Sequence, residues 1–282
     1  MAGIEGKLCV ITGATSGIGL VTAQKLAAKG ARLVLVGRDP TRGEAALAAI
    51  RARAPRAEVS IHYADLSRLD ALRTLAAGLN ALSRIDVLIN NAGAMFWRRQ
   101  VTADGLEGTF ALNHMAYFVL TALLRDKLAS APARVVNVAS EAHRGAELDF
   151  GDLQSAHGYS GMRAYSRSKL CNILFTRELA RRLSGTGVTA NCLHPGFVNS
   201  RFGDNNPGLV GFGTRIAKQL LAISPERGAE TPVYLASSPA VEGKSGGYYD
   251  QCAPKTPSPE AQDDAAARRL WEESARIAGV SP

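Results

Sequence analysis

The chain has 282 residues, of which 46% are hydrophobic and 21% charged, the proportions of a folded globular protein with a sizeable core. Its net charge of +8 comes from Lys and Arg residues scattered without a long basic block, which argues against nucleic acid as a partner. The four cysteines lie far apart and form no metal-binding pattern with His, so we expect reduced thiols, no metal site and a cytoplasmic location.

The first apolar run covers residues 8–11 and predicts a short buried strand. It is too short for a signal peptide or a membrane anchor, so we expect no membrane span. A glycine-rich stretch comes next, Gly13-Ala14-Thr15-Ser16-Gly17-Ile18-Gly19, followed by a helical pattern through Leu26. A strand, a glycine turn and a helix in this order let backbone N–H groups approach a pyrophosphate at the helix N-terminus. The stretch therefore predicts a dinucleotide site.

A second strand over residues 32–36 ends at Gly37-Arg38-Asp39. The residue just past this strand is expected to meet the adenosine ribose, where an acid would accept from the 2′-hydroxyl and repel a 2′-phosphate. Arg38 suits the extra phosphate of NADP by its charge and its fork geometry. The alternative is a surface arginine in a turn, next to an acidic Asp39, and it leaves NAD open.

A third strand is predicted over residues 58–63, followed by Asp65-Leu66 and a helix to about Leu82. Asp65 is suited to accept a hydrogen bond from the adenine amino group. A fourth strand over 86–89 ends in Asn90-Asn91-Ala92-Gly93, whose small Ala-Gly corner would let a cofactor lie against the backbone.

A long helix is predicted over 105–129 with Asn113 in its middle, where Asn is unfavourable and suggests a functional reason. A fifth strand over 135–138 delivers Ser140 to the C-terminal edge of the sheet, the edge where ligands bind in open parallel sheets. A helix from Met162 to Leu183 then places Tyr165 and Lys169 four residues apart on one face. An ammonium one turn from a phenol stabilises the phenolate and pulls its pKa down toward neutrality.

The remaining segments are a sixth strand over 187–193 ending in His194-Pro195-Gly196, a loop over 199–213, a helix over 224–237, a seventh strand over 246–249 and a helix over 261–278. Strands that alternate with helices predict a single-domain α/β protein with a parallel sheet. We expect a seven-stranded parallel sheet flanked by helices, and one domain over residues 1–282. A substrate loop at about 197–223 and a C-terminal extension at about 253–282 complete it.

With these motifs in place, nearly the whole chain resembles the short-chain dehydrogenase/reductase family. The matching segments are Thr12-Gly-Ala-Thr-Ser-Gly-Ile-Gly19, Asn90-Asn-Ala-Gly93, Ser140, Tyr165-x-x-x-Lys169 and Pro195-Gly196, in the family's order and spacing. Further stretches, such as Ser168-Lys-Leu-Cys-Asn-Ile-Leu-Phe-Thr176, are similar to the retinol dehydrogenase and WW-domain-containing oxidoreductase branch. The resemblance implies a doubly wound (Rossmann) fold, a nicotinamide cofactor and hydride transfer between an alcohol and a carbonyl.

Carried onto this chain, the resemblance implies a catalytic set of Asn113, Ser140, Tyr165 and Lys169. Tyr165 is then the general acid/base, and Lys169 lowers its pKa and holds the nicotinamide ribose. Ser140 binds the substrate oxygen, and Asn113 anchors a water that links Lys169 to solvent. The residues expected at the cofactor are Gly13, Thr15, Ser16, Gly17, Ile18, Gly19, Arg38, Asp65, Leu66, Asn91, Ala92, Gly93, Tyr165, Lys169, Pro195, Gly196, Val198 and Ser200.

An apolar substrate pocket is expected beside these residues. Met95, Phe96 and Trp97 follow Gly93 and would form one wall, with Phe197 and the loop around Phe202 as a lid; plain core packing is the alternative for each.

The leading hypothesis is thus an NADP-dependent oxidoreductase of a bulky apolar alcohol or carbonyl that is retinoid-, steroid- or aromatic-ketone-like. The alternatives are an NAD-dependent alcohol dehydrogenase, a non-catalytic dinucleotide sensor or scaffold, and dehydration or epimerisation on the same scaffold. Family resemblance also predicts a homodimer or homotetramer through the helices that carry Asn113 and Tyr165. The C-terminal extension is in a position to block one such interface.

Overall fold

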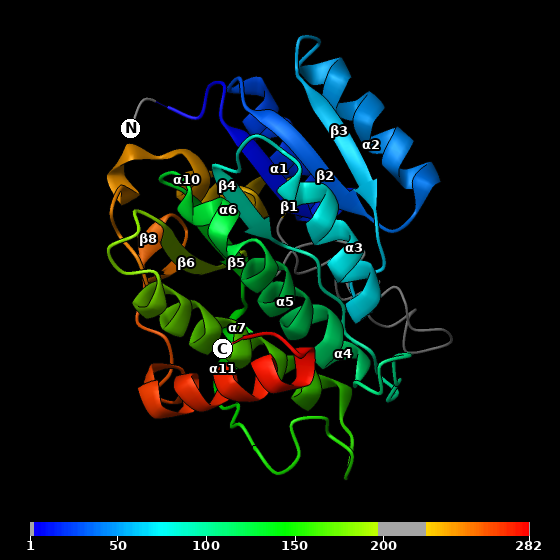
Figure 1. Cartoon of the computed structure of the whole chain (residues 1–282), viewed down its shortest axis with the longest axis vertical. Helices are drawn as coiled ribbons and strands as arrows, with labels where there is room; N and C mark the ends of the chain where they lie inside the picture. The colour runs from blue at the N-terminus through cyan, green and yellow to red at the C-terminus, as the bar shows by residue number, and fades with distance from the viewer. Residues whose placement is uncertain (1–2, 197–223, 282) are drawn as a thin grey trace.

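A central twisted sheet forms the framework of the computed structural model, which describes residues 3–196 and 224–281 (Figure 1). Within these residues the sheet has the strand order β3-β2-β1-β4-β5-β6-β7-β8. The strands are β1 Leu8–Thr12, β2 Arg32–Gly37, β3 Val59–Tyr63, β4 Val87–Asn90, β5 Arg134–Val138, β6 Thr189–His194, β7 Tyr248–Asp250 and β8 Ala253–Pro254. The seven predicted parallel strands are confirmed, but the seven-stranded count is wrong. The two-residue β8 pairs antiparallel with β7, and it is too short to leave a periodic pattern.

Helices cover both faces of the sheet, as predicted for a doubly wound fold. They are α1 Gly17–Ala28, α2 Pro40–Arg53, α3 Leu69–Asn80, α4 Gly108–Phe110, α5 Ala116–Leu123, α6 Arg125–Ala129, α7 Gly161–Arg182, α9 Pro225–Gly228, α10 Glu230–Ser237 and α11 Asp264–Ala278. Short 3₁₀ turns occupy Glu141–His143 (η2), Pro239–Val241 (η3) and Glu260–Gln262 (η4). The expected loop at 199–213 and the lid residues Phe197 and Phe202 lie outside the described residues.

Two helical segments differ from the sequence prediction. Helix α2, which the sequence analysis did not place, begins at Pro40 and is capped by Asp39, whose carboxylate accepts from the Arg42 backbone N–H at 3.1 Å. The long helix expected over 105–129 starts instead at Gly108 and contains a π turn, η1, over Ala111–Met115. A π turn inserts an extra residue into the helix and is frequent at functional sites.

Successive strand residues point to opposite faces, so the sheet separates two hydrophobic cores. Leu8 and Val10 of β1 pack with α3, α5, α7 and α11 on one face. Cys9 and Ile11 of the same strand pack with α1, α2 and α10 on the other. Burial on both faces explains why β1 and its neighbours are continuous apolar runs rather than alternating ones.

The sheet reverses its winding between β1 and β4, which are hydrogen-bonded neighbours. The C-terminal ends of parallel strands lie at one edge, so the segments after β1, β4, β5 and β6 meet there. The glycine-rich turn, the Asn91–Gly93 segment, Ser140 and the Pro195-Gly196 pair follow these four strands in turn. In this fold class a ligand crevice is expected at such a switch point.

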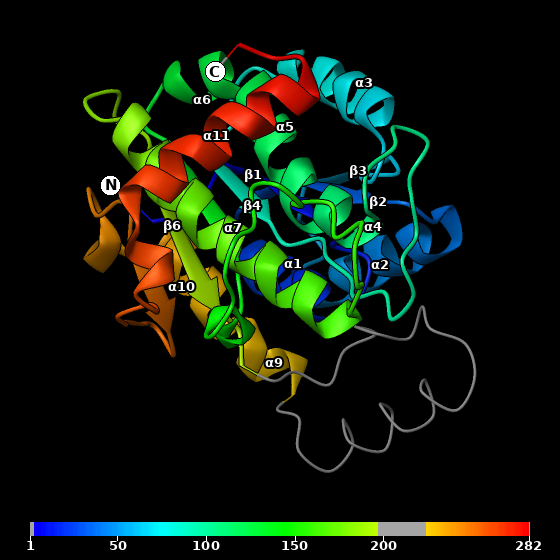
Figure 2. The ribbon, with the colours of Figure 1, turned by 90° about the horizontal axis from the view of Figure 1, so that it is seen from below.

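The C-terminal helix α11 lies across α5 and α7 (Figure 2). Leu270 is fully buried, and the Trp271 ring packs edge-on against Phe118 at 5.0 Å and stacked on Phe175 at 5.8 Å between ring centres. Leu270 and Trp271 thus anchor the C-terminal helix on the rest of the protein. The face of α5 and α7 expected to bind a second copy is therefore covered by this chain's own helix, and the oligomeric state stays a prediction.

Candidate active site

The glycine-rich turn between β1 and α1 packs tightly against the segment that follows β4. Gly13 and Gly17 have φ values of +65° and +54°, which favour glycine. A Cβ on Gly13 would lie 2.8 Å from the Ala92 Cα, and one on Gly19 would lie 2.4 Å from the Gly13 carbonyl oxygen. The Asn91 side chain fixes this approach, because its Nδ2 donates to the backbone oxygens of Thr12 and Gly13 at 2.9 and 3.2 Å.

The N-terminus of α1 is suited to bind a phosphate. Ser16 takes the N-cap position, and its side chain makes no capping hydrogen bond. The first-turn N–H groups, which include those of Ile18 and Gly19, have no partner within a helix. Together with the positive end of the helix dipole, they fit the pyrophosphate of a dinucleotide.

Arg38 stands just past β2 and is exposed. A Cβ on Gly37 would lie 2.5 Å from the Thr15 Cγ2, so the glycine-rich turn and the end of β2 are in close contact. Asp39, the acid that weakened the NADP interpretation, caps α2 and pairs with Arg42 at 3.6 Å. The Asp39 carboxylate is therefore engaged with its own helix, and Arg38 remains available to an anion near the turn.

The adenosine side of the crevice is predicted to involve Asp65 and Leu66. Leu66 is buried in the core, whereas the Asp65 carboxylate is half-buried. Its Oδ1 accepts from the backbone N–H and the hydroxyl of Ser67, at 3.1 and 2.7 Å. An adenine amino group would therefore meet the other carboxylate oxygen.

The two predicted reactive hydroxyls meet at the C-terminal end of β5. Ser140 follows β5 in extended backbone and caps the η2 turn, where its Oγ accepts from the Ala142 N–H at 3.2 Å. Tyr165 lies in the second turn of α7, a helix that starts after the Ser160 cap. The Ser140 side chain acts on the Tyr165 hydroxyl as a hydrogen-bonding group that favours the ionised phenol. Residues 25 positions apart are thus brought together by the packing of α7 on the sheet.

Lys169 lies beneath this pair and is 3% exposed. Its Nζ donates to the Val138 carbonyl at 2.9 Å and stands 5.6 Å from the centre of the Tyr165 ring. A second ring, that of Tyr117, has its centre 5.9 Å from the same nitrogen. Burial lowers the pKa of Lys169 to about 7, because an ammonium loses its hydration there.

The pKa of Tyr165 moves in the direction opposite to the expected one. Burial raises it to about 12, and the hydrogen bond with Ser140 opposes that rise. The spacing of Tyr165 and Lys169 led us to expect a lowered pKa, because sequence shows the neighbouring cation and not the desolvation of both groups. At neutral pH the phenol therefore holds its proton.

Asn113 connects three segments of the site. Its Nδ2 donates to the Ala94 carbonyl and to the Ser168 hydroxyl, both at 2.9 Å, and its Oδ1 accepts from the Ala94 N–H at 2.9 Å. The Ser168 hydroxyl in turn donates to the Tyr165 carbonyl at 2.7 Å. The amide of Asn113 thus ties η1 to the segment after β4 and to α7. Both Nδ2 hydrogens of Asn113 are used in these bonds, so the predicted water would have to donate to an oxygen acceptor there.

The remaining predicted residues have three different placements. Gly93 lies beside the catalytic set, because a Cβ there would be 3.2 Å from the Asn113 Oδ1 and 3.6 Å from the Lys169 Nζ. Pro195 and Gly196 directly follow β6, at the same sheet edge. Val198 and Ser200 lie outside the described residues.

The expected pocket wall is anchored on α7. A Cβ on Gly161 would lie 2.5 Å from the Phe96 carbonyl oxygen, which also accepts from the Tyr159 hydroxyl at 2.6 Å. Met95 is buried, and Phe96 and Trp97 are half-buried. The segment therefore sits one helical turn before Tyr165.

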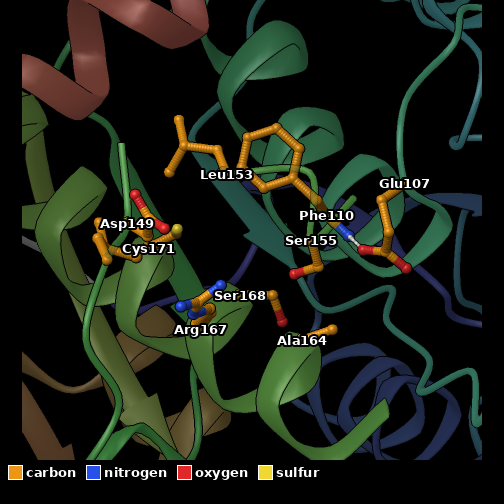
Figure 3. A pocket seen from close by; sticks show the side chains of 10 residues that line it. Glu107, Phe110, Asp149, Leu153, Ser155, Ala164, Arg167, Ser168 and Cys171 are labelled. Atoms are coloured by element: carbon orange, nitrogen blue, oxygen red, sulfur yellow. Dashed lines mark hydrogen bonds between the residues drawn. The ribbon is translucent and has the colours of Figure 1, made fainter. Parts of the chain in front are cut away.

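A small cavity lies beside the site, between α4, α7 and the loop before α7 (Figure 3). Ser168 and Cys171 line it from α7, and the Glu107 carboxylate borders it while accepting from the backbone N–H groups of Thr109 and Phe110. Its room is that of about one water molecule. Its lining residues do not include Tyr165 or Lys169, so it is separate from the reacting centre.

Sequence reasoning did not predict the burial of His143, near Ser140. His143 is fully buried, and its Nδ1 lies 2.7 Å from the Ser140 carbonyl oxygen. His194 accepts from the Glu141 N–H through Nδ1 at 3.1 Å. The position of His143 three residues after Ser140 was the available signal.

Two further expectations concern a metal site and a membrane span, neither of which the sequence predicts. In residues 3–196 and 224–281, no cluster of His, Cys, Asp and Glu is arranged to hold a metal ion. Over the same residues, no helix combines the length and the apolar character that crossing a membrane requires. The four cysteines are free, and three of them are buried.

Residues 7–207 match the profile of the short chain dehydrogenase family. Human retinol dehydrogenase 13 is 43% identical, over 99% of this chain and 86% of the relative, and human retinol dehydrogenase 14 is 41% identical, over 98% and 88%. A solved structure of an uncharacterized Mycobacterium paratuberculosis protein is 33% identical with a TM-score of 0.79, covering 99% of this chain and 95% of the other. The short-chain dehydrogenase from Sphingobium yanoikuyae in complex with NADPH is 25% identical with a TM-score of 0.65, covering 80% and 82%.

Proposed function

Because the chain belongs to the short-chain dehydrogenase/reductase family and acts on CH–OH groups, we propose that it is an NADP-dependent enzyme for a bulky apolar substrate. In this proposal, hydride passes between the nicotinamide and the alcohol or carbonyl carbon of a retinoid-, steroid- or aromatic-ketone-like molecule. The substrate class draws support from the names of the relatives, which include retinol dehydrogenases 12, 13 and 14.

One observation carries the catalytic part of the proposal. The Ser140 side chain is close enough to the Tyr165 hydroxyl to act on its pKa, and the buried amine of Lys169 stands 5.6 Å from the centre of the Tyr165 ring. Desolvating an amine and a phenol together is expensive, so an arrangement of this kind is more typical of a reactive site than of a binding site.

The chain's own groups divide the proton chemistry between them. When bound, the nicotinamide supplies or accepts the hydride. The Tyr165 hydroxyl, protonated at neutral pH, donates its proton to the carbonyl oxygen of the substrate. The Ser140 hydroxyl donates a hydrogen bond to the same oxygen and stabilises the negative charge that develops there. In the oxidation direction Tyr165 must first lose its proton, and the nearby ammonium form of Lys169 favours that loss.

The choice of NADP rests on Arg38. It is exposed next to the glycine-rich turn, while Asp39 is held by the first turn of α2. Arg38 would pair with the 2′-phosphate, the first-turn N–H groups of α1 would hold the pyrophosphate, and Lys169 would bind the nicotinamide ribose. Among similar solved structures, the Sphingobium yanoikuyae dehydrogenase is in complex with NADPH, which supports the same cofactor.

The test is a panel of aldehydes, ketones and secondary alcohols, from small to retinoid-sized, with NADP(H) and NAD(H) at matched concentrations. Turnover is followed by the absorbance of the reduced nicotinamide. We expect the highest kcat/KM with NADPH and large apolar carbonyls. Products analysed without added cofactor would expose dehydration or epimerisation, and a preference for NAD(H) would favour the NAD-dependent alcohol dehydrogenase.

Tyr165→Phe separates an enzyme from a non-catalytic sensor. We expect kcat to fall by roughly 10²- to 10⁴-fold, the usual contribution of a general acid, with NADPH binding retained. Tyr63→Phe is the matched control, because Tyr63 is exposed on β3 at the far edge of the sheet. Wild-type protein that binds NADPH and turns over no member of the panel would favour the sensor. The cytoplasmic location remains a prediction beside this proposal.

A further inference from the structure

His143 occupies an unusual position for a histidine next to a reactive serine. It closes the η2 turn that begins at Ser140, and its side chain is fully buried. Its Nδ1 lies 2.7 Å from the Ser140 carbonyl oxygen, and its Nε2 accepts from the Ser258 backbone N–H at 3.1 Å. Ser258 is 115 residues further along the chain. The imidazole therefore bridges the reactive turn and the C-terminal segment.

These two contacts fix the tautomer of the ring. A backbone N–H can only donate, so the Nε2 that receives it has no proton. A carbonyl oxygen can only accept, so the Nδ1 facing Ser140 carries the proton. The ring is thus neutral with its proton on Nδ1. The imidazole ring packs nearly perpendicular to the Tyr248 ring, with 5.2 Å between ring centres.

Charged groups around the ring belong to the same junction. Glu141 accepts from the Tyr248 hydroxyl and the Lys255 amine, both at 3.0 Å, and also from the Arg144 guanidinium. Arg144 donates in addition to the Thr256 carbonyl at 2.8 Å. The groups that act on His143 electrostatically are Glu141, Arg144, His194, Lys255 and Glu260. Burial dominates and lowers the pKa of His143, which keeps the ring neutral at pH 7.

We propose that His143 is a positioning residue through which the C-terminal segment 255–258 sets the place of the Ser140 hydroxyl. This inference rests on the proposed function, because Ser140 acts on substrate only in an oxidoreductase. The Ala142 N–H donates to the Ser140 hydroxyl, and the His143 ring binds the Ser140 carbonyl oxygen. A shift of the η2 turn therefore moves the Ser140 hydroxyl away from Tyr165. His143 itself contacts neither Tyr165 nor Lys169 through any of these bonds.

His143→Phe is the decisive variant, because Phe keeps a planar ring against Tyr248 and removes both hydrogen bonds. We expect kcat for the best carbonyl substrate to fall at least tenfold, while the KM and Kd for NADPH stay within twofold. The primary isotope effect with deuterated NADPH should rise, because a misplaced Ser140 slows the chemical step. His143→Asn leaves an amide N–H near the position of Nδ1, and we expect it to recover part of the kcat. His157→Asn is the matched control, since His157 is exposed on the surface and its ring pairs with Asp152.

Two readouts do not depend on activity. The ¹⁵N shifts of the ring, assigned among five histidines by substitution, should show one neutral ring protonated on Nδ1 at pH 7.5. Amide hydrogen exchange of residues 140–144 and 255–259 should accelerate in His143→Phe and stay unchanged in His157→Asn.

The outcomes separate the two proposals. The positioning role is overturned if the His143 ring is protonated on Nε2 or charged. It is also overturned if His143→Phe folds and its kcat is within twofold of the wild-type value. If His143→Phe does not fold, His143→Asn decides by the same kcat criterion. If the wild type turns over no carbonyl or alcohol, the proposed function has failed and the positioning of Ser140 for catalysis fails with it. The ring tautomer and the exchange rates would then still establish or refute the link between the turn and the C-terminal segment.

Discussion

The ammonium nitrogen of Lys169 stands 5.6 Å from the centre of the Tyr165 ring, and its hydrogen bond goes to the Val138 carbonyl. The amine and the ring are in contact range, and both groups are desolvated by burial. Burial moves the two pKa values in opposite directions, to about 7 for Lys169 and about 12 for Tyr165. Both shifts favour neutral forms, and this relationship leads to the first prediction.

Lys169 should make the folding stability depend on pH between about 7 and 10. In the unfolded chain its amine keeps the proton up to a pKa near 10.5, whereas in the folded chain it loses the proton above about 7. The unfolded state binds more protons in this window, so stability from this group rises with pH. Compared with Lys169→Met, the wild type should gain about 1.4 kcal/mol of unfolding free energy per pH unit.

Urea unfolding of both proteins at pH 6.5, 7.5, 8.5 and 9.5 measures the difference. The thiols and other titrating groups are present in both proteins, so their contributions cancel in the comparison. A difference that stays constant with pH would show that the Lys169 pKa is not lowered in the folded protein.

Arg38→Asp should shift the cofactor preference from NADPH toward NADH. The variant removes a guanidinium that would pair with the 2′-phosphate and adds a carboxylate that repels it. A charge-assisted hydrogen bond contributes about 1.5–3 kcal/mol, so the ratio of kcat/KM for the two cofactors should change by roughly 10- to 150-fold.

Arg56→Asp makes the same change of charge at an exposed residue beyond the C-terminal end of α2, and should leave that ratio unaltered. If the ratio is the same in wild type and Arg38→Asp, Arg38 plays no part in cofactor choice.

Gly19→Ala should weaken cofactor binding, because the new Cβ would lie 2.4 Å from the Gly13 carbonyl oxygen and 2.5 Å from the Asn91 Nδ2. The glycine-rich turn must move away from the segment after β4 to relieve these contacts. We expect the Kd for NADPH, measured by fluorescence titration, to rise at least tenfold.

Gly78→Ala is the contrasting variant. Gly78 lies inside α3, where a Cβ would be 3.5 Å from the nearest atom, on His62. This substitution should stabilise the protein by about 0.5–1 kcal/mol and leave the Kd unchanged. Equal Kd values for Gly19→Ala and the wild type would contradict the close contact of the turn.

Leu270→Ala should destabilise the protein by about 2–5 kcal/mol, the usual cost of a cavity at a fully buried leucine. Leu270 belongs to α11, which packs on α7, the helix that carries Tyr165 and Lys169. Denaturant unfolding measures the loss. Arg268→Ala, an exposed residue of the same helix, should change stability by less than about 0.5 kcal/mol. Equal unfolding midpoints for the two variants would show that α11 is not anchored by its buried face.

The features that sequence alone predicted are local ones. The glycine-rich turn follows from a buried strand, three glycines and a helical pattern within about twenty residues. Two residues four apart lie on one face of any helix, so the spacing of Tyr165 and Lys169 places their side chains together wherever the helix lies in the fold. The closeness of the residues that follow β1, β4, β5 and β6 was also predictable, because parallel strands place their C-terminal ends at one edge of the sheet.

Other features required the tertiary structure. Asn113 binds Ala94 and Ser168, and His143 bridges Ser140 and Ser258, through contacts between segments whose approach no periodic pattern encodes. The covering of α5 and α7 by α11 is of the same kind. An amphipathic pattern shows that a helix has an apolar face and does not show which surface it meets.

The sequence by itself determined the fold class and the glycine-rich turn, because each depends on residue type and short-range spacing, and its resemblance to a family supplied the candidate catalytic groups. Only the tertiary structure decided how those groups are charged and held. Desolvation depends on every atom packed around a group, and it outweighs the single neighbouring charge that the Tyr165–Lys169 spacing reveals.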